Sequence, residues 1–201
     1  MAILASALTT AARVKTRIGT SESTWDALLA ELINAATEFI EGELGRNLKS
    51  ATYTNQLYDI EAGQRLLILR QWPVASVSSI QYRAGSISTP SWTTLQTDDW
   101  EIVGDGRQGA IRLYISLKDT NAIRVTYVAG YGIDFSTPAN HTLPYELIDL
   151  CERLVVRAFK RRESEGKTTE GASAGGNTSW LEGLNADDRK MLTRHTRAAF
   201  C

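Results

Sequence analysis

The feature that most constrains this chain is an amphipathic stretch over residues 24–44, TWDALLAELINAATEFIEGEL. Ser23 and Asp26 form a capping-box pattern at its start, and Gly45 is suited to end it. A helix of about 20 residues is roughly 30 Å long, so other elements can pack along it. Its apolar residues recur at helical spacing and define one broad buried stripe: Trp25, Leu28, Leu29, Leu32, Ile33, Ala36, Ile40 and Leu44.

Two further helices are predicted on either side of the middle of the chain. Apolar residues near helical spacing predict a helix over residues 3–18 that ends at Gly19 and forms a hairpin with the 24–44 helix. Another is predicted over residues 144–162, because Pro144 suits the first turn of a helix and two apolar rows follow it.

The stretch between 53 and 128 is typical of strands and turns. Its short runs are rich in Val, Ile, Tyr, Leu and Trp, and no helical pattern lies between them, which favours antiparallel hairpins. Pro73 divides one run into two strands, since proline donates no ladder hydrogen bond. The predicted fold class is α+β: antiparallel helices packed with a small antiparallel sheet. The predicted strands are 53–60, 65–70, 74–83, 100–103, 110–115 and 121–128.

The C-terminal part changes in composition. Residues 1–163 form the predicted main domain, whereas residues 164–183 are rich in Gly, Ser and Thr and are predicted to be a flexible linker. Asn185 and Asp188 then open a short amphipathic helix within 184–201. We expect this basic helix to be an arm that docks on a partner and not on its own domain; the alternative is a merely frayed terminus.

Bulk properties exclude several classes of protein. The chain has 201 residues and a formal net charge of −1. Its two cysteines, Cys151 and Cys201, are too few for a disulfide framework and too far apart in the sequence for a CxxC metal motif. Basic residues outnumber acidic ones only from Cys151 onward. This excess of positive charge is far smaller than that of an autonomous DNA-binding protein. With no signal-peptide pattern and no membrane span, we expect a protein made in a cytosol.

No pattern in the sequence predicts catalysis, a cofactor or a metal. The glycine cluster 104–109 lacks the GK[ST] ending of a phosphate loop and is better explained as a hairpin turn. His141 and His195 have no paired spacing or cysteine partners. A small hydrolase that uses His141 and Asp134 remains a minor alternative, since such groups meet only in the fold.

Four stretches, in their order and spacing, resemble the head–tail connector, or adaptor, proteins of long-tailed bacteriophages. These stretches are DALLAELINAATEFIEGELGR, LLILRQWPVASVSSIQY, IRVTYVAGYG and LPYELIDLCERLVVRAFKRRE. The resemblance covers most of residues 26–163 and implies a structural virion protein without catalysis. Such adaptors form a ring, generally dodecameric, beneath the portal protein, extend the DNA channel and present a surface to a stopper or tail protein.

The resemblance also assigns roles to residues of this chain. Trp72, Trp92 and Trp100 become subunit-contact candidates, although Trp72 could equally lie in the core. DNA would pass through the ring without sequence-specific binding, and no membrane would be involved. The helix 144–162 and the arm after it would face the portal, which makes the following residues portal-docking candidates: Arg157, Lys160, Arg161, Arg162, Trp180, Leu184, Met191, Leu192 and Phe200.

Two alternatives to the adaptor remain besides the hydrolase. Another neck or tail-completion protein on the tail side would have the same architecture but a different partner. A DNA-binding regulator that uses the basic tail would bind duplex DNA with a steep salt dependence, whereas an adaptor would bind it weakly or not at all.

Overall fold

The computed structural model describes residues 2–84, 88–89, 91–115, 121–162 and 184–197, together with two short strands at 169–171 and 177–179. The chain divides into two compact units. The helical unit comprises Met1–Gly45 and Ile133–Thr196, and the strand unit comprises Arg46–Gly132 and Arg197–Cys201. The predicted α+β class is confirmed.

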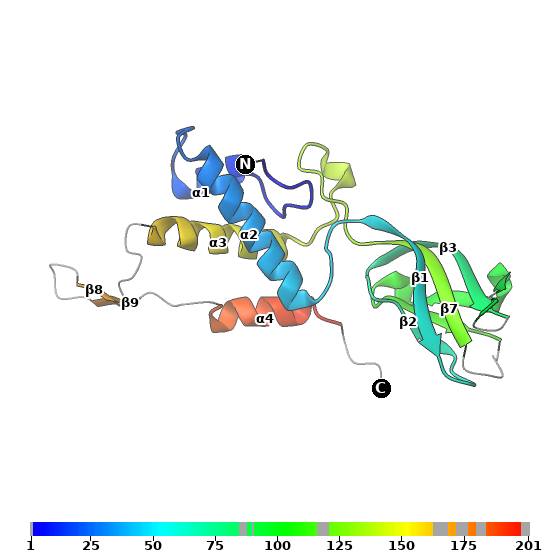
Figure 1. Ribbon diagram of the computed structural model, residues 1–201. Coiled ribbons are helices and arrows are strands. Elements are labelled where there is room, and N and C mark those ends of the chain that lie inside the picture. Colours follow the sequence, from blue (N-terminus) through cyan, green and yellow to red (C-terminus); the bar gives the residue numbers. More distant parts are fainter. Residues whose placement is uncertain are drawn as a thin grey trace. The chain divides into compact units, whose positions relative to one another are not determined.

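The helical unit contains α1 (Ala11–Ile18), α2 (Asp26–Leu44), α3 (Tyr145–Arg161) and α4 (Ala186–Arg194), with a 3-10 turn, η3, at Pro138–Asn140. Helix α2 packs across α3, and both α1 and α4 contact α3 (Figure 1). The core of the unit consists of fully or almost fully buried apolar side chains from all four helices and the N-terminal segment: Leu8, Val14, Leu29, Ile33, Ile40, Leu147, Ile148, Leu150, Val155, Phe159 and Leu192.

Helix α2 confirms the long amphipathic helix, although its first turn differs from the prediction. Trp25 is the N-cap residue and makes no side-chain capping bond, so the predicted Ser23 capping box is wrong. The Ser23 carbonyl instead accepts the Asp26 amide at 3.0 Å, and the Asp26 carboxylate forms an ion pair with Lys15 of α1. Gly45 ends the helix in the left-handed conformation (φ 63°), as predicted.

The first helix is shorter than predicted, because residues before Thr10 are not helical. The Thr10 side chain accepts the Arg13 amide and caps α1. The preceding backbone is bonded to side chains of α2: the Leu4 amide donates to Asn34 Oδ1 at 2.9 Å, and the Leu8 amide donates to Thr37 Oγ1 at 3.2 Å. These two polar side chains replace the intrahelical bonds that the apolar spacing had predicted.

The strand unit is built from two antiparallel sheets. The four-stranded sheet has the order β1 (Ala51–Ile60), β7 (Asn121–Ala129), β3 (Val74–Arg83), β4 (Trp92–Thr94). The three-stranded sheet has the order β2 (Leu66–Ile68), β6 (Ala110–Leu113), β5 (Trp100–Val103), with 3-10 turns η1 at Thr97–Asp99 and η2 at Gly104–Gly106. All six predicted strands are present, and β4 was missed.

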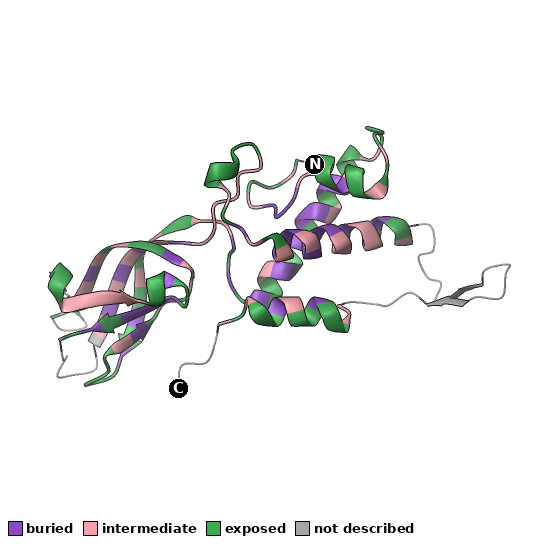
Figure 2. Ribbon diagram, turned by 180° about the vertical axis from the view of Figure 1, so that it is seen from behind, coloured by how far each residue is buried: buried purple, intermediate pink, exposed green. Residues whose placement is uncertain are grey.

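One apolar cluster joins the two sheets of the strand unit. Its buried side chains come from both sheets, and Figure 2 shows purple segments along both. Alternate residues of β7 point into it, namely Ile123, Val125 and Tyr127. The Tyr127 and Tyr58 hydroxyl groups form a buried hydrogen bond of 3.0 Å, so the polar atoms of this pair satisfy each other.

Turn chemistry in the strand unit agrees with the sequence. Pro73, which follows a cis peptide bond, separates β2 from β3, so the run is divided into two strands as predicted, and the structure places these strands in different sheets. The glycine cluster 104–109 connects β5 to β6, which confirms a hairpin connection and not a phosphate loop. Gly106 has φ of 75°, and a Cβ there would lie 2.1 Å from the Val74 carbonyl oxygen.

The C-terminal part corrects one expectation. Helix α4 packs on α3 of its own chain, whereas we expected an arm that would not fold back on its own domain. The Asn185 capping box predicted at its start is present. Within the predicted linker 164–183 the structure describes only β8 (Thr169–Gly171) and β9 (Asn177–Ser179), which pair antiparallel. The rest of that prediction lies outside the described residues.

Candidate interaction surfaces

Asp188 is the centre of the contact between α4 and α3. Its carboxylate is completely buried and accepts a hydrogen bond from Arg157 at 2.5 Å, and it forms an ion pair with Arg153 at 3.2 Å; both arginines are on α3. The same carboxylate accepts the Asn185 amide and so completes the cap of its own helix. A buried carboxylate is expensive unless it is paired, and here two guanidinium groups compensate it.

The remaining contacts of α4 with α3 are also mostly polar. Arg194 donates to Glu146 Oε1 at 2.9 Å, and His195 lies 3.1 Å from the other carboxylate oxygen of Glu146. Leu192 is the one α4 side chain in the apolar core. Most of the side-chain contacts between α4 and α3 are therefore polar, and Leu192 supplies the buried apolar side chain of α4.

Ion pairs continue from α4 across α3 to α1. Arg153 also pairs with Asp149 at 3.0 Å. Arg17 of α1 pairs with two carboxylates of α3, with Asp149 at 2.7 Å and with Glu152 at 3.2 Å. Glu152 is only 6% exposed and also accepts Arg13 Nε at 2.7 Å. Pairs linked into one network hold side chains in place better than isolated surface pairs do.

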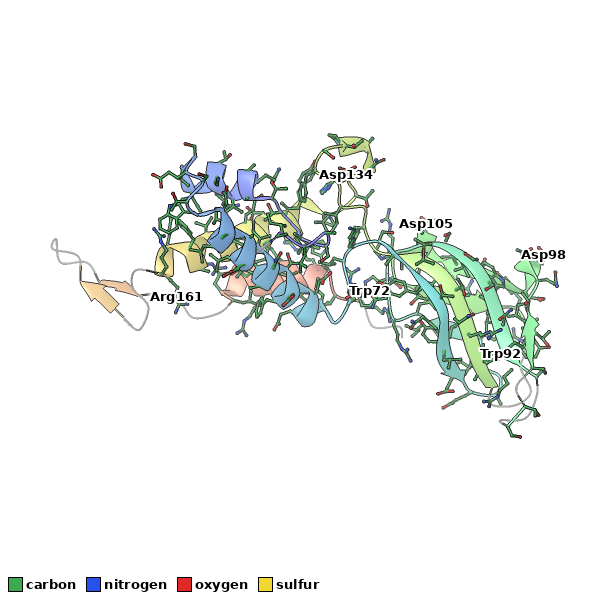
Figure 3. All side chains as sticks on the ribbon, turned by 45° about the horizontal axis from the view of Figure 1, so that its top comes forward. Trp72, Trp92, Asp98, Asp105, Asp134 and Arg161 are labelled. Carbon is green, nitrogen blue, oxygen red and sulfur yellow. The ribbon has the colours of Figure 1, made fainter. Side chains whose placement is uncertain are left out.

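The basic end of α3 contains four of the portal-docking candidates. Arg157 is occupied by Asp188, and Arg162 stacks over Phe159 and Trp25 while it donates to the Phe159 carbonyl. Lys160 is exposed and Arg161 is half-buried at the end of the helix, where Figure 3 labels Arg161. Thus Lys160 presents its charge at this end and Arg161 is partly accessible, whereas Arg157 and Arg162 make the contacts within the helical unit described above.

The candidates in the C-terminal segment separate in the same way. Leu192 is buried and Met191 accepts a hydrogen bond from Arg153 of α3, so both side chains are occupied within the helical unit of their own chain. Leu184 lines an open groove of about 500 Å³ between α2 and α4, together with Phe39, which is 42% exposed. Trp180 and Phe200 lie outside the described residues.

Trp72 lies between arginine side chains in the strand unit. Arg46 and Arg197 place their guanidinium carbons 4.4 Å and 4.0 Å from the Trp72 ring centroid. Arg46 also donates to the Trp72 carbonyl, and Arg197 donates to the Leu69 carbonyl. Burial lowers the pKa of both arginines, and the charge of Arg46 lowers the pKa of Arg197 further.

The other two tryptophans occupy different positions in the strand unit. Trp92, labelled in Figure 3, is half-buried on the short strand β4. The guanidinium carbon of Arg124 lies 4.4 Å from the centroid of its ring. Trp100 is half-buried on β5 and packs against the apolar cluster between the two sheets. Each leaves part of its ring accessible, so a subunit contact remains a prediction for both.

The loop before α3 does not form a hydrolytic dyad. Asp134 Oδ1 accepts the Ser136 hydroxyl and the Ser136 and Thr137 amides, and these bonds lower the pKa of Asp134. The backbone amide of Asp134 donates to His141 Nδ1 at 3.3 Å. The hydrogen bond to the imidazole thus comes from the backbone of Asp134 and not from its carboxylate. The carboxylate therefore shapes its own turn and is not placed to orient the imidazole.

Two further observations concern metals and membranes. Over the described part of the chain, no three His, Cys, Asp or Glu side chains are grouped where they could hold a metal ion. None of the described helices combines the length and the apolar character that crossing a membrane requires.

Sequence reasoning missed the centre of the α3–α4 contact and the Trp72 cluster. Asp188 had been identified only as a capping residue. Asp149, Arg153 and Arg157 follow one another at i, i+4 spacing, a signal for one charged face of α3. The opposite charge on α4 could have been matched to that face. Arg46 and Arg197 gave no such signal, since contacts between residues so far apart depend on the fold.

The comparisons with known proteins agree with the fold. No curated protein matches the sequence at a significant level. A solved chain of the neck of an empty GTA particle, computed with C6 symmetry, matches with a TM-score of 0.56 and 15% identity, over 100% of this chain and 95% of that one. The family model described as head completion protein matches residues 7–186. The chain therefore belongs to the head completion protein family.

Proposed function

We propose that this protein is a structural subunit of the virion neck that forms a ring beneath the portal, joins the DNA-filled head to the tail and extends the DNA channel. The family match over residues 7–186 carries this proposal. It agrees with the resemblance to head–tail connector proteins in the sequence, and it supports a structural role in the virion.

The sixfold symmetry of the matched neck supports a ring. The matched chain was solved in a neck computed with C6 symmetry, and the match extends over the whole of this chain. A dodecamer also contains a sixfold axis, so the expected dodecamer is compatible with that neck. A closed ring uses heterologous contacts, in which one surface of each copy meets a different surface of the next.

The described surface offers apolar side chains for such contacts. Tyr145 is 76% exposed at the start of α3, and Phe39 lies in the groove between α2 and α4. In the strand unit, Leu57 and Tyr114 are each 53% exposed, and Trp92 is partly accessible. Large apolar groups on two different units suit a subunit with neighbours on two sides.

The charge of the chain suits a channel through which DNA slides. The formal net charge is −1, so the subunit as a whole does not attract phosphates strongly. Many Lys or Arg contacts with phosphates would hold DNA in place, and the affinity for DNA would then depend steeply on the salt concentration. The ring is therefore proposed to surround DNA without sequence-specific binding.

Lys160 and Arg161 are the basic residues best placed to meet the portal. They end α3, where cations are favourable, and their charges are not used by Asp188. Arg157, Arg162, Met191 and Leu192 are better explained by the internal contacts of the helical unit. A subunit on the tail side of the neck is the second candidate, because the family and the matched neck allow either position.

Native mass spectrometry of the full chain mixed with the portal oligomer from the same genome tests the proposal. We expect a full ring of copies to add to the portal, and the variant Lys160→Ser/Arg161→Ser to add weakly. Arg107→Ser is the control, since it removes an exposed cation of the strand unit. Addition to the tail's upper end and not to the portal would favour the tail-side position, and no addition to either would contradict the proposal.

A further inference from the structure

We propose that α4 is exchanged between neighbouring subunits of the assembled ring, so that α4 of one copy occupies α3 of the next through the same contacts that it makes within the free chain. This inference rests on the proposed ring. Its partner is a second copy of this chain, and its site is the face of α3 formed by Glu146, Arg153 and Arg157.

The contacts of α4 are specific and local. One completely buried carboxylate, Asp188, meets two guanidinium groups, and Arg194 and His195 meet Glu146. The charge of this face of α3 changes sign along the helix, with Glu146 near its start and Arg153 and Arg157 toward its end. The face therefore fits one helix in one direction, and every copy of the chain supplies both that helix and its receptor.

The connection between α3 and α4 is long enough to reach a neighbour. Arg161 ends α3 and Ala186 begins α4, so 24 residues (162–185) separate the two helices. The antiparallel β8–β9 pair places residues 169 and 179 side by side, so the 13 residues outside it (162–168 and 180–185) set the reach. Fully extended, they span up to roughly 45 Å, still more than the diameter of a small domain. The covalent connection therefore does not oblige α4 to return to its own α3.

Ring assembly lets the α3 face of a neighbour compete with the chain's own α3 for each α4. The exchanged and internal contacts are the same, so they differ little in free energy, and the occupancy depends on how often each α3 face is encountered. In a ring, every neighbour presents an identical α3 face within reach of the connection. Exchange then adds a bond between subunits without any new surface, which makes it a low-cost route to a stable assembly.

Isotope-resolved crosslinking tests this exchange. Arg194 and Glu146 are both exposed and 2.9 Å apart, so Arg194→Lys should allow a zero-length carbodiimide crosslink between Lys at 194 and Glu146. Equal amounts of unlabelled and ¹⁵N-labelled copies of this variant are mixed before they assemble on the portal, and the masses of the crosslinked peptides are measured by mass spectrometry. With exchange in a randomly mixed ring, about half of the 194–146 crosslinks should join a labelled to an unlabelled peptide.

The chain supplies an internal control. Lys15 and Asp26 form an ion pair between α1 and α2, which are joined by a short loop, so their crosslink should remain within one copy. The change Glu146→Gln should abolish the 194–146 crosslink. Isotopically pure 194–146 crosslinks in a fully formed ring would overturn the exchange and leave the proposed function intact. A wild-type chain that forms no ring on any neck component would overturn both.

A charge reversal gives a second measurement that does not depend on crosslinking. Asp188→Lys and Arg157→Glu should each weaken assembly when present alone, because each opposes like charges across the α3–α4 contact. With exchange, a mixture of the two variants should assemble better than either alone, since complementary charges meet between copies. If only the double variant on one chain recovers assembly, α4 stays on its own α3 and the proposal is wrong.

Discussion

The carboxylate of Asp188 and the guanidinium of Arg157 join α4 to α3 through an ion pair between residues 31 positions apart in the sequence. The carboxylate is completely buried, whereas the guanidinium remains partly exposed. This asymmetry means that Asp188 depends on the pair more than Arg157 does, because only the carboxylate has lost all contact with water.

Asp188→Asn should loosen α4 without unfolding the rest of the helical unit. Removing a charge from a fully buried pair costs about 3–5 kcal/mol, and the partial exposure of both arginines reduces the expected loss to about 1–3 kcal/mol. Hydrogen exchange should show faster exchange in α4 than in α2. The control is Asp187→Asn, which removes a charge from the exposed neighbouring residue. Unchanged protection of α4 would show that Leu192 and the contacts of Arg194 and His195 with Glu146 hold the helix without the charge of Asp188.

Thr37→Val should destabilise the N-terminal segment more than its small change in shape suggests. The Leu8 amide donates to Thr37 Oγ1 in the interior, and valine would leave this amide without an acceptor. A buried unsatisfied group costs about 1–3 kcal/mol. Thermal melting should show this loss, whereas Thr37→Ser keeps the hydroxyl and should retain the hydrogen bond. Equal losses in the two variants would indicate that the methyl group matters and not the hydrogen bond.

Ile33→Ala should cost more stability than Leu32→Ala, although both residues belong to the apolar stripe predicted for α2. Ile33 is completely buried and Leu32 only half-buried. A large-to-small change at a buried aliphatic residue costs about 2–5 kcal/mol, partly because of the cavity that it leaves. Denaturant unfolding of the two variants measures the difference. A larger loss for Leu32→Ala would mean that a partner surface covers that side of the helix.

Apolar periodicity, with Gly45 and Pro144 as boundary signals, predicted α2 and α3, because a helix that packs on one side repeats its apolar residues whatever surrounds it. The same rule failed before Thr10, where apolar residues at helical spacing lie in irregular backbone. There Asn34 and Thr37 supply the hydrogen bonds that a helix would otherwise make internally. A side chain of one segment that satisfies the backbone of another leaves no periodic trace in the sequence.

The contact of α4 with α3 shows a second limit of sequence reasoning. Residues 184–201 were recognised as an amphipathic helix, but the surface that this helix covers depends on where α3 presents its charges. Asp188 serves both as a cap and as a buried counter-ion, and only the first role is local. The tryptophans raise the same difficulty, since the Arg46 and Arg197 contacts of Trp72 arise from segments far apart in the chain.

The thiol of Cys151 should make stability fall at alkaline pH. Burial raises the pKa of Cys151 from its ordinary value of 9.0 to about 12. Because the folded pKa lies above the unfolded one, this contribution is fully present below pH 9 and is lost as the pH rises toward 12. Denaturant unfolding of the wild type between these values should show a decline that Cys151→Ala reduces. A thiol-specific reagent should reach Cys151 only after unfolding, and rapid labelling of the native protein at Cys151 would contradict its burial.

Gly106→Ala should destabilise the strand unit far more than Gly63→Ala. Both glycines have positive φ, 75° and 79°, so alanine in that backbone conformation costs about 1–2 kcal/mol at either position. Only at Gly106 would the new Cβ meet backbone, 2.1 Å from the Val74 carbonyl oxygen, while nothing lies within 4 Å at Gly63. The start of β3 must then move, and we expect a further loss of about 1–3 kcal/mol. Denaturant unfolding of both variants isolates the clash from the backbone strain that they share, and equal losses would mean that η2 shifts away from β3 without cost.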